Sequence, residues 1–121
     1  MTLLAISLAA IAGPAEAEVE VTGSVIDLRA AKPGSRVDLT KPWPRVVGAT
    51  VRLLPSGART TTGPDGRFVV RAETDKPQEL VVKARGFGTR RMLCMTSGNV
   101  RIRLLSRNVS DDVHCLLLHR R

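Results

Sequence analysis

Short stretches of β-branched and apolar residues, divided by turn sequences, constrain the fold of this chain more than any other feature. Within most stretches apolar and polar residues alternate, which is typical of a strand with one buried face. The predicted strands are residues 19–25, 50–54, 59–62, 67–72, 80–84, 89–95, 100–104 and 113–118. Seven or eight short strands at roughly ten-residue spacing predict one all-β domain, a single antiparallel β-sandwich.

Several residues within this pattern are expected to serve the fold. In the turn at residues 63–66, Asp65 can hydrogen-bond to the backbone and Gly66 can take a positive φ. Phe68 should face the core, because it alternates with polar neighbours in its strand. We assign a structural role, in turns or core, to Gly48, Asp65, Gly66, Phe68, Gly86 and Phe87.

Residues 1–17 have the pattern of a secretory signal peptide. An uncharged apolar run is followed by Gly13-Pro14 and by small residues on either side of Glu16. The run is shorter than the roughly 18 residues that a membrane-spanning helix needs, so we expect no transmembrane anchor after processing. This predicts a secreted or periplasmic protein. The alternative interpretation is a buried N-terminal helix or strand.

The chain has two cysteines, Cys94 and Cys115. In an exported protein such a pair predicts a disulfide, and closing a loop of about twenty residues stabilises a fold by roughly 3 kcal/mol. Two buried free thiols are the alternative. The spacing fits neither a zinc site nor a redox motif. Residues 109–121 are therefore expected to form a C-terminal extension, a strand tethered by this disulfide.

The protein is strongly basic, with a formal net charge of +8. The arginines are dispersed along the sequence. Either they only solvate the outward faces of the strands, or together they form a surface that attracts polyanions. The candidate contact residues are Arg85, Arg90, Arg91, Arg101 and Arg103. Only 2% of the residues are aromatic, and base-stacking platforms need aromatic side chains, so nucleic acid is not expected as the natural ligand.

Residues 27–45 are expected to form a long loop around Trp43. Prolines at 42 and 44 flank this tryptophan, which excludes a helix interior or a central strand there. Trp43 is either an exposed platform for a sugar ring or a plug that covers the end of the sandwich. The second interpretation is favoured, because tryptophan is highly buried on average.

The residues needed for catalysis are scarce. His114 and His119 are the only histidines, and their spacing puts them on opposite faces of a strand. The sequence contains no nucleophile elbow, zinc-protease motif or phosphate-binding glycine loop. We therefore predict a protein that is not an enzyme and that has no cofactor and no metal site.

The ordered motifs of residues 18–108 resemble the carboxypeptidase regulatory-like domain, a transthyretin-like β-sandwich. The resemblance rests on the pieces Val21-Thr-Gly23-Ser-Val25, Gly48-Ala-Thr-Val-Arg-Leu53, Thr62-Gly-Pro-Asp-Gly-Arg-Phe68, Gly86-Phe87 and Val100-Arg-Ile-Arg-Leu104. It implies a non-catalytic module that interacts with a protein partner, here in the cell envelope. Related sandwiches bind starch, so a glycan is the first alternative ligand, and a polyanion held by the arginines is the second.

Overall fold

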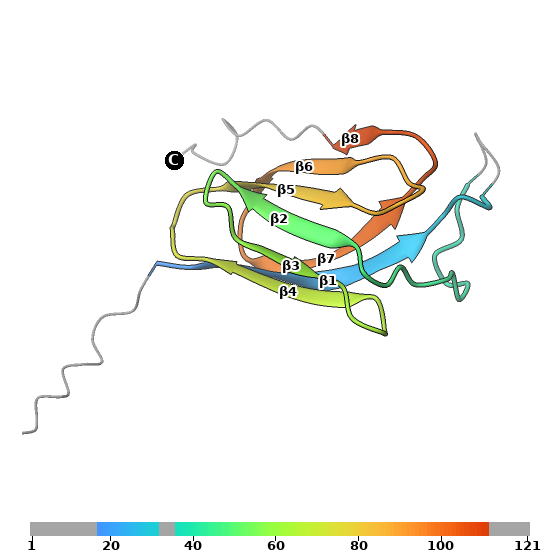
Figure 1. Cartoon of the computed structure of the whole chain (residues 1–121), viewed down its shortest axis with the longest axis horizontal. Helices are drawn as coiled ribbons and strands as arrows, with labels where there is room; N and C mark the ends of the chain where they lie inside the picture. The colour runs from blue at the N-terminus through green and yellow to red at the C-terminus, as the bar shows by residue number, and fades with distance from the viewer. Residues whose placement is uncertain (1–16, 32–35, 112–121) are drawn as a thin grey trace, which may run out of the picture.

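The computed structural model describes residues 17–31 and 36–111, which form two β-sheets packed face to face (Figure 1). The strands are β1 (Val19–Asp27), β2 (Thr50–Leu54), β3 (Arg59–Thr61), β4 (Arg67–Ala72), β5 (Gln78–Lys83), β6 (Arg90–Met95), β7 (Gly98–Leu104) and β8 (Val109–Asp111). One sheet has the order β4-β1-β7 and the other β3-β2-β5-β6-β8. The predicted all-β sandwich is thus confirmed. Within the described ranges, no helix is long and apolar enough to cross a membrane.

The strand directions differ from the expected antiparallel arrangement in two places. β1 pairs with β7 in parallel, and β6 pairs with β8 in parallel. The chain reaches β7 directly from β6, which belongs to the other sheet. No hairpin joins β7 to β1, so nothing forces these two neighbours to run in opposite directions.

The described chain ends at the start of the expected C-terminal extension. The short strand β8 (Val109–Asp111) covers the first residues of the segment 109–121, ahead of the strand predicted at 113–118. The predicted strand at 113–118 lies outside the described residues, as do residues 1–16 of the predicted signal peptide and both histidines. Cys94 lies in β6, whereas Cys115 is outside the described residues, so the disulfide stays a prediction.

The core lies between the two sheets and is built from the inward positions of both. In β4 the exposed and buried residues alternate strictly, so that Phe68 and Val70 point inward. The opposite sheet supplies Val51, Leu53 and Leu80, each with no exposed surface. Side chains of this kind stabilise a fold by roughly 1.5–3 kcal/mol each when fully buried.

The turn residues position the strands that carry the core. Gly48, Gly66 and Gly86 have φ values of +79°, +75° and +85°. Residues with a Cβ atom rarely adopt these angles, whereas glycine does so readily. Asp65 Oδ1 accepts a hydrogen bond from the Arg67 backbone N–H at 3.0 Å, which holds the start of β4 against its turn.

Arg90 is part of the interior, in contrast to its expected place among the exposed ligand contacts. Only 7% of the residue is exposed. Its Nη2 donates to both carboxylate oxygens of Asp111, at 2.7 and 2.8 Å, and its Nη1 donates to the Arg103 carbonyl at 3.2 Å. Arg90 therefore joins β6 to β8 within one sheet and reaches β7 in the other. A guanidinium with these partners is not available to a ligand.

Candidate functional site

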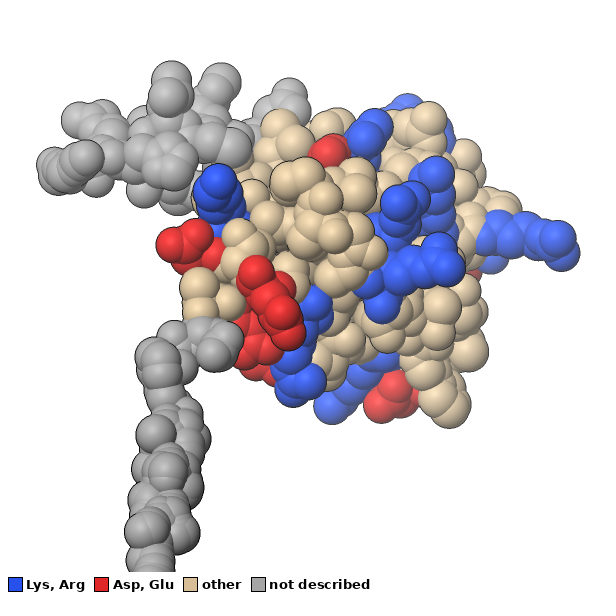
Figure 2. All heavy atoms as spheres, turned by 60° about the vertical axis from the view of Figure 1, so that its left-hand side comes forward, with Lys and Arg blue, Asp and Glu red and all other residues tan. Residues whose placement is uncertain are grey.

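On the face seen in Figure 2, basic side chains outnumber acidic ones, and many of them lie on the right-hand side of the view. Some of the arginines are neutralised. Arg71 pairs with Glu20 at 2.9 Å, and Arg91 pairs with Glu79 at 2.8 Å. Arginines without such carboxylate partners are the ones that can attract an acidic ligand.

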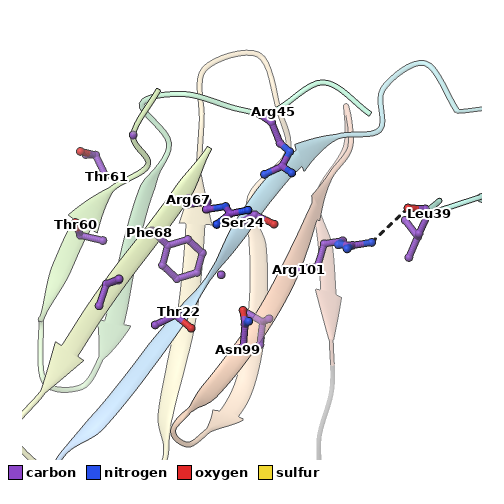
Figure 3. A pocket seen from close by; sticks show the side chains of 14 residues that line it. Thr22, Ser24, Leu39, Arg45, Thr60, Thr61, Arg67, Phe68, Asn99 and Arg101 are labelled. Carbon is purple, nitrogen blue, oxygen red and sulfur yellow. Dashed lines mark hydrogen bonds between the residues drawn. The ribbon is translucent and has the colours of Figure 1, made fainter. Parts of the chain in front are cut away.

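A broad groove runs over the outside of the three-stranded sheet. We call it the outer groove (Figure 3). It has a volume of about 1010 Å³ and is open to solvent. Its lining comes from β1, β4, β7 and β3 and from two loops. The polar and basic side chains that line it are Thr22, Ser24, Arg45, Thr60, Thr61, Arg67, Asn99 and Arg101.

The register of the sheet sets the side chains of the outer groove in rows. Ser24 at the centre lies opposite Arg67 on β4 and opposite Arg101 on β7. Because residues two apart on a strand share a face, Thr22 is next in line, between Val69 and Asn99. At one end of the groove the Ser24 hydroxyl thus lies between the side chains of two arginines. Figure 3 shows that the Arg45 side chain points toward the same end.

These three arginines make only weak contacts with the rest of the described protein. Arg101 Nη1 donates to the Leu39 carbonyl at 3.4 Å, and Arg45 Nη1 donates to the Asp65 carbonyl at 3.2 Å. Arg67 lies 4.0 Å from the Asp65 carboxylate, and both of these side chains are well exposed. An exposed pair at this distance contributes little, so most of the positive charge is available to a ligand.

The outer groove also contains apolar surface. Leu39 and Val69 are two of the exposed large hydrophobic residues in the described part of the chain, and 36% and 47% of their surfaces are accessible. Apolar side chains beside arginine are typical of the surfaces with which proteins contact each other.

The other predicted contact residues are spread over the molecule. Arg101 lines the outer groove, and Arg103 is exposed on the same strand but does not line it. Arg91 lies on the outside of the five-stranded sheet, and Arg85 is exposed in the turn after β5. The structure therefore does not bring these arginines together in one site.

Trp43 is not among the residues that line the outer groove. Its side chain is half-buried, and its indole Nε1 donates to the Asp38 carbonyl at 2.8 Å. This hydrogen bond closes the segment of residues 38–43 on itself. Nothing in these contacts favours Trp43 as a platform for a sugar ring.

Three residues of the outer groove, Ser24, Arg45 and Arg67, were not predicted from the sequence. They are far apart in the chain and come together only through the β1–β4 pairing and a single bridge between Ile26 and Arg45. The one signal that could have singled out Arg67 is its outward position next to the buried Phe68.

A second group of polar contacts serves the fold. The Arg29 guanidinium lies 4.0 Å from the centroid of the Phe87 ring and pairs with Asp27 at 3.0 Å. Its Nη1 also donates to the Gly86 carbonyl at 3.4 Å. Arg29 thus ties the end of β1 to the turn that contains Phe87, which is half-buried against the core.

The Asp27–Arg29 pair should make stability depend on pH at the acidic end. The side-chain hydrogen bond from Arg29 holds the pKa of Asp27 below its usual value of 3.8. A carboxyl group whose pKa is lower in the folded state stabilises the fold above pH 3.8, and this contribution disappears as the pH falls through the folded-state pKa. Urea unfolding should be measured at several pH values from about 5 down to about 2, a range that covers this titration. As the pH falls, the free energy of unfolding should decrease more steeply for the wild type than for Asp27→Asn. Arg29→Ala should reduce this pH dependence in the same way. If the free energy of unfolding depends on pH equally in all three proteins, the Asp27–Arg29 pair does not cause the dependence.

The described residues offer no arrangement suited to metal-dependent chemistry. No group of three or more His, Cys, Asp or Glu side chains in residues 17–31 and 36–111 could hold a metal ion. The outer groove is lined by hydroxyl, amide, guanidinium and apolar groups. These groups can recognise an anionic ligand through hydrogen bonds and charge.

Comparison with known proteins gives matches among solved structures alone. No protein-family model matches the sequence, and no curated protein matches it. Two similar chains come from type II cohesin–X-dockerin complexes of Acetivibrio cellulolyticus, one an N-terminal and the other a C-terminal interface mutant. They are 14% and 12% identical to this chain, with TM-scores of 0.47 and 0.46, over 76% and 80% of its length. This chain spans 56% and 62% of theirs.

Proposed function

We propose that this protein is a non-catalytic interaction module of the cell envelope, and that it binds an acidic, partly apolar segment of a partner protein in the outer groove. The observation that carries the proposal is the composition of that groove. Arg45, Arg67 and Arg101 surround a serine, and Leu39 and Val69 provide exposed apolar surface beside them. The signal-peptide pattern and the resemblance to carboxypeptidase regulatory-like domains support an exported accessory module.

The geometry suits a peptide segment better than a compact small molecule. The groove is open and follows three neighbouring strands, which lie about 4.8 Å apart. The rows Arg67–Ser24–Arg101 and Val69–Thr22–Asn99 offer charge in one row and a more apolar surface in the next. A segment in which acidic and apolar side chains occur close together would satisfy both rows.

The proposal can be tested with a peptide panel and the mature chain. Short peptides that combine Leu or Val with Asp or Glu should shift the backbone amide NMR signals of Thr22, Ser24 and Asn99. Matched peptides with Lys in place of the acidic residues should not. We expect Arg101→Ala to weaken binding about fivefold, which corresponds to the loss of one exposed charge contact of about 1 kcal/mol.

Arg107→Ala is the matched control, because it also removes one exposed arginine but lies outside the outer groove. It should bind the acidic peptides as the wild type does. Equal binding of acidic and basic peptides would refute the proposed recognition of carboxylates. Signal shifts confined to other strands would refute the proposed site.

A further inference from the structure

A second basic surface lies on the opposite side of the sandwich, and we call it the arginine face. It is the outside of the five-stranded sheet and carries Arg59 on β3, Arg52 on β2, Lys83 on β5 and Arg91 on β6. In the register of this sheet Arg59 lies opposite Arg52, Arg52 opposite Val81, and Val81 opposite Arg91. The three arginines therefore form one straight row across four strands, about 14 Å long at the usual strand spacing.

The charge of this row is poorly balanced by the described protein. Like charges directly opposite each other in neighbouring strands destabilise a sheet, and Arg52 and Arg59 stand in this relation. Arg52 Nε is buried and has no hydrogen-bond partner within the described part of the chain. In the strands of this sheet, Glu79 is the acidic residue that shares the outer face, and it pairs with Arg91. An anion laid along the row would supply the missing counter-charge.

The row borders a groove of about 480 Å³ that holds two kinds of polar group. Arg52, Lys83 and Arg91 provide positive charge, and Thr89, Asn108 and Ser110 provide hydroxyl and amide groups. A ligand with both anionic substituents and neutral hydroxyl groups would use both kinds. Acidic polysaccharides have this chemistry along their whole length.

Two other classes of polyanion fit this surface less well. No aromatic side chain lines the groove, so the bases of a single-stranded nucleic acid would find no stacking partner. The exposed large hydrophobic residues in the described ranges are Leu39, Val47 and Val69, and none of them belongs to this groove. The apolar residues that do line it, Leu54, Val81 and Val109, are buried or half-buried, whereas insertion into a lipid bilayer needs well-exposed apolar side chains.

We propose that the arginine face binds a linear acidic polysaccharide, whose chain runs across strands β3, β2, β5 and β6. The anionic groups contact the arginines and Lys83, and the sugar hydroxyls contact Thr89, Asn108 and Ser110. This site is separate from the outer groove, since it belongs to the other sheet. Its existence does not depend on the partner proposed for that groove.

Calorimetric titration of the mature protein with a heparin-derived oligosaccharide tests this proposal. The test variant is Arg59→Ala/Lys83→Ala, because both side chains are exposed and neither forms an ion pair within the described residues. We expect on the order of tenfold weaker binding at moderate salt, together with a shallower dependence of affinity on NaCl concentration, because fewer counterions are released. The matched control is Arg103→Ala/Arg107→Ala, which loses the same charge from exposed positions outside this groove. It should bind nearly as tightly as the wild type.

Several outcomes would overturn the proposal. Equal weakening by the test and control variants would mean that net charge alone drives binding. Tighter binding of duplex DNA, or of vesicles rich in phosphatidylserine, at the same ionic strength would assign the surface to a different polyanion. Loss of secondary structure in the test variant is checked by circular dichroism. In that event Arg59→Gln/Lys83→Gln replaces it, and undiminished binding by this second variant would refute the site.

Discussion

Phe68→Ala is expected to lower the free energy of unfolding by about 3–5 kcal/mol, the usual cost of emptying the space of a buried phenylalanine. Phe68 is 4% exposed and packs in the cluster that joins the two sheets. Most small domains are stable by only about 5–15 kcal/mol in total, so this variant should lose a large share of its stability.

Urea unfolding followed by circular dichroism measures this effect. Val47→Ala is the matched control, since Val47 is 60% exposed and should change the unfolding free energy by less than about 0.5 kcal/mol. If both variants unfold at the same urea concentration, Phe68 is not part of the packed core.

Gly23→Ala should lower the free energy of unfolding by an amount similar to that expected for Phe68→Ala, but for a different physical reason. Gly23 lies in β1 where the backbone carbonyl of Val100 in β7 comes so close that a methyl group would overlap it. Backbone atoms of a paired strand cannot move aside without breaking the pairing, so we expect a cost of about 3 kcal/mol or more. Thermal unfolding should show a correspondingly lower midpoint.

Gly98→Ala separates this steric effect from the general effect of replacing glycine in a strand. Gly98 begins β7, and a methyl group there would meet no atom within 4 Å. This variant should be as stable as the wild type or slightly more stable, because alanine loses less backbone entropy on folding. Equal destabilisation by both substitutions would contradict the close approach of Gly23 and Val100.

The fold class could be predicted from the sequence because alternation is a local property. The alternating residues 50–54 and 67–72 coincide with β2 and β4. Direction is different, since the side-chain pattern of a strand is the same whether its neighbour is parallel or antiparallel. The parallel pairing of β1 with β7 therefore could not be predicted from the sequence pattern.

The sites were harder to predict, because they depend on pairs of residues that are far apart in the chain. Arg90 and Arg91 are adjacent and cannot be distinguished in the sequence. Arg90 is buried and pairs with Asp111, whereas Arg91 is exposed and pairs with Glu79. Ser24 has no distinguishing local signal, and it becomes the middle residue of a row in the outer groove only once the register places Arg67 and Arg101 on its two sides. The same holds for the row on the arginine face, which combines four separate strands.

The central position of β1 has a consequence for how the protein is made. β1 is the first described strand to be synthesised, but it lies between β4 and β7 and needs both of them as neighbours. The three-stranded sheet therefore stays incomplete until residue 104 has been added. Until then the edge of β1 that pairs with β7 is unpaired, and an unpaired strand edge is the kind of surface on which nascent chains aggregate. A chain with this strand order benefits from being kept unfolded until nearly all of it has been synthesised.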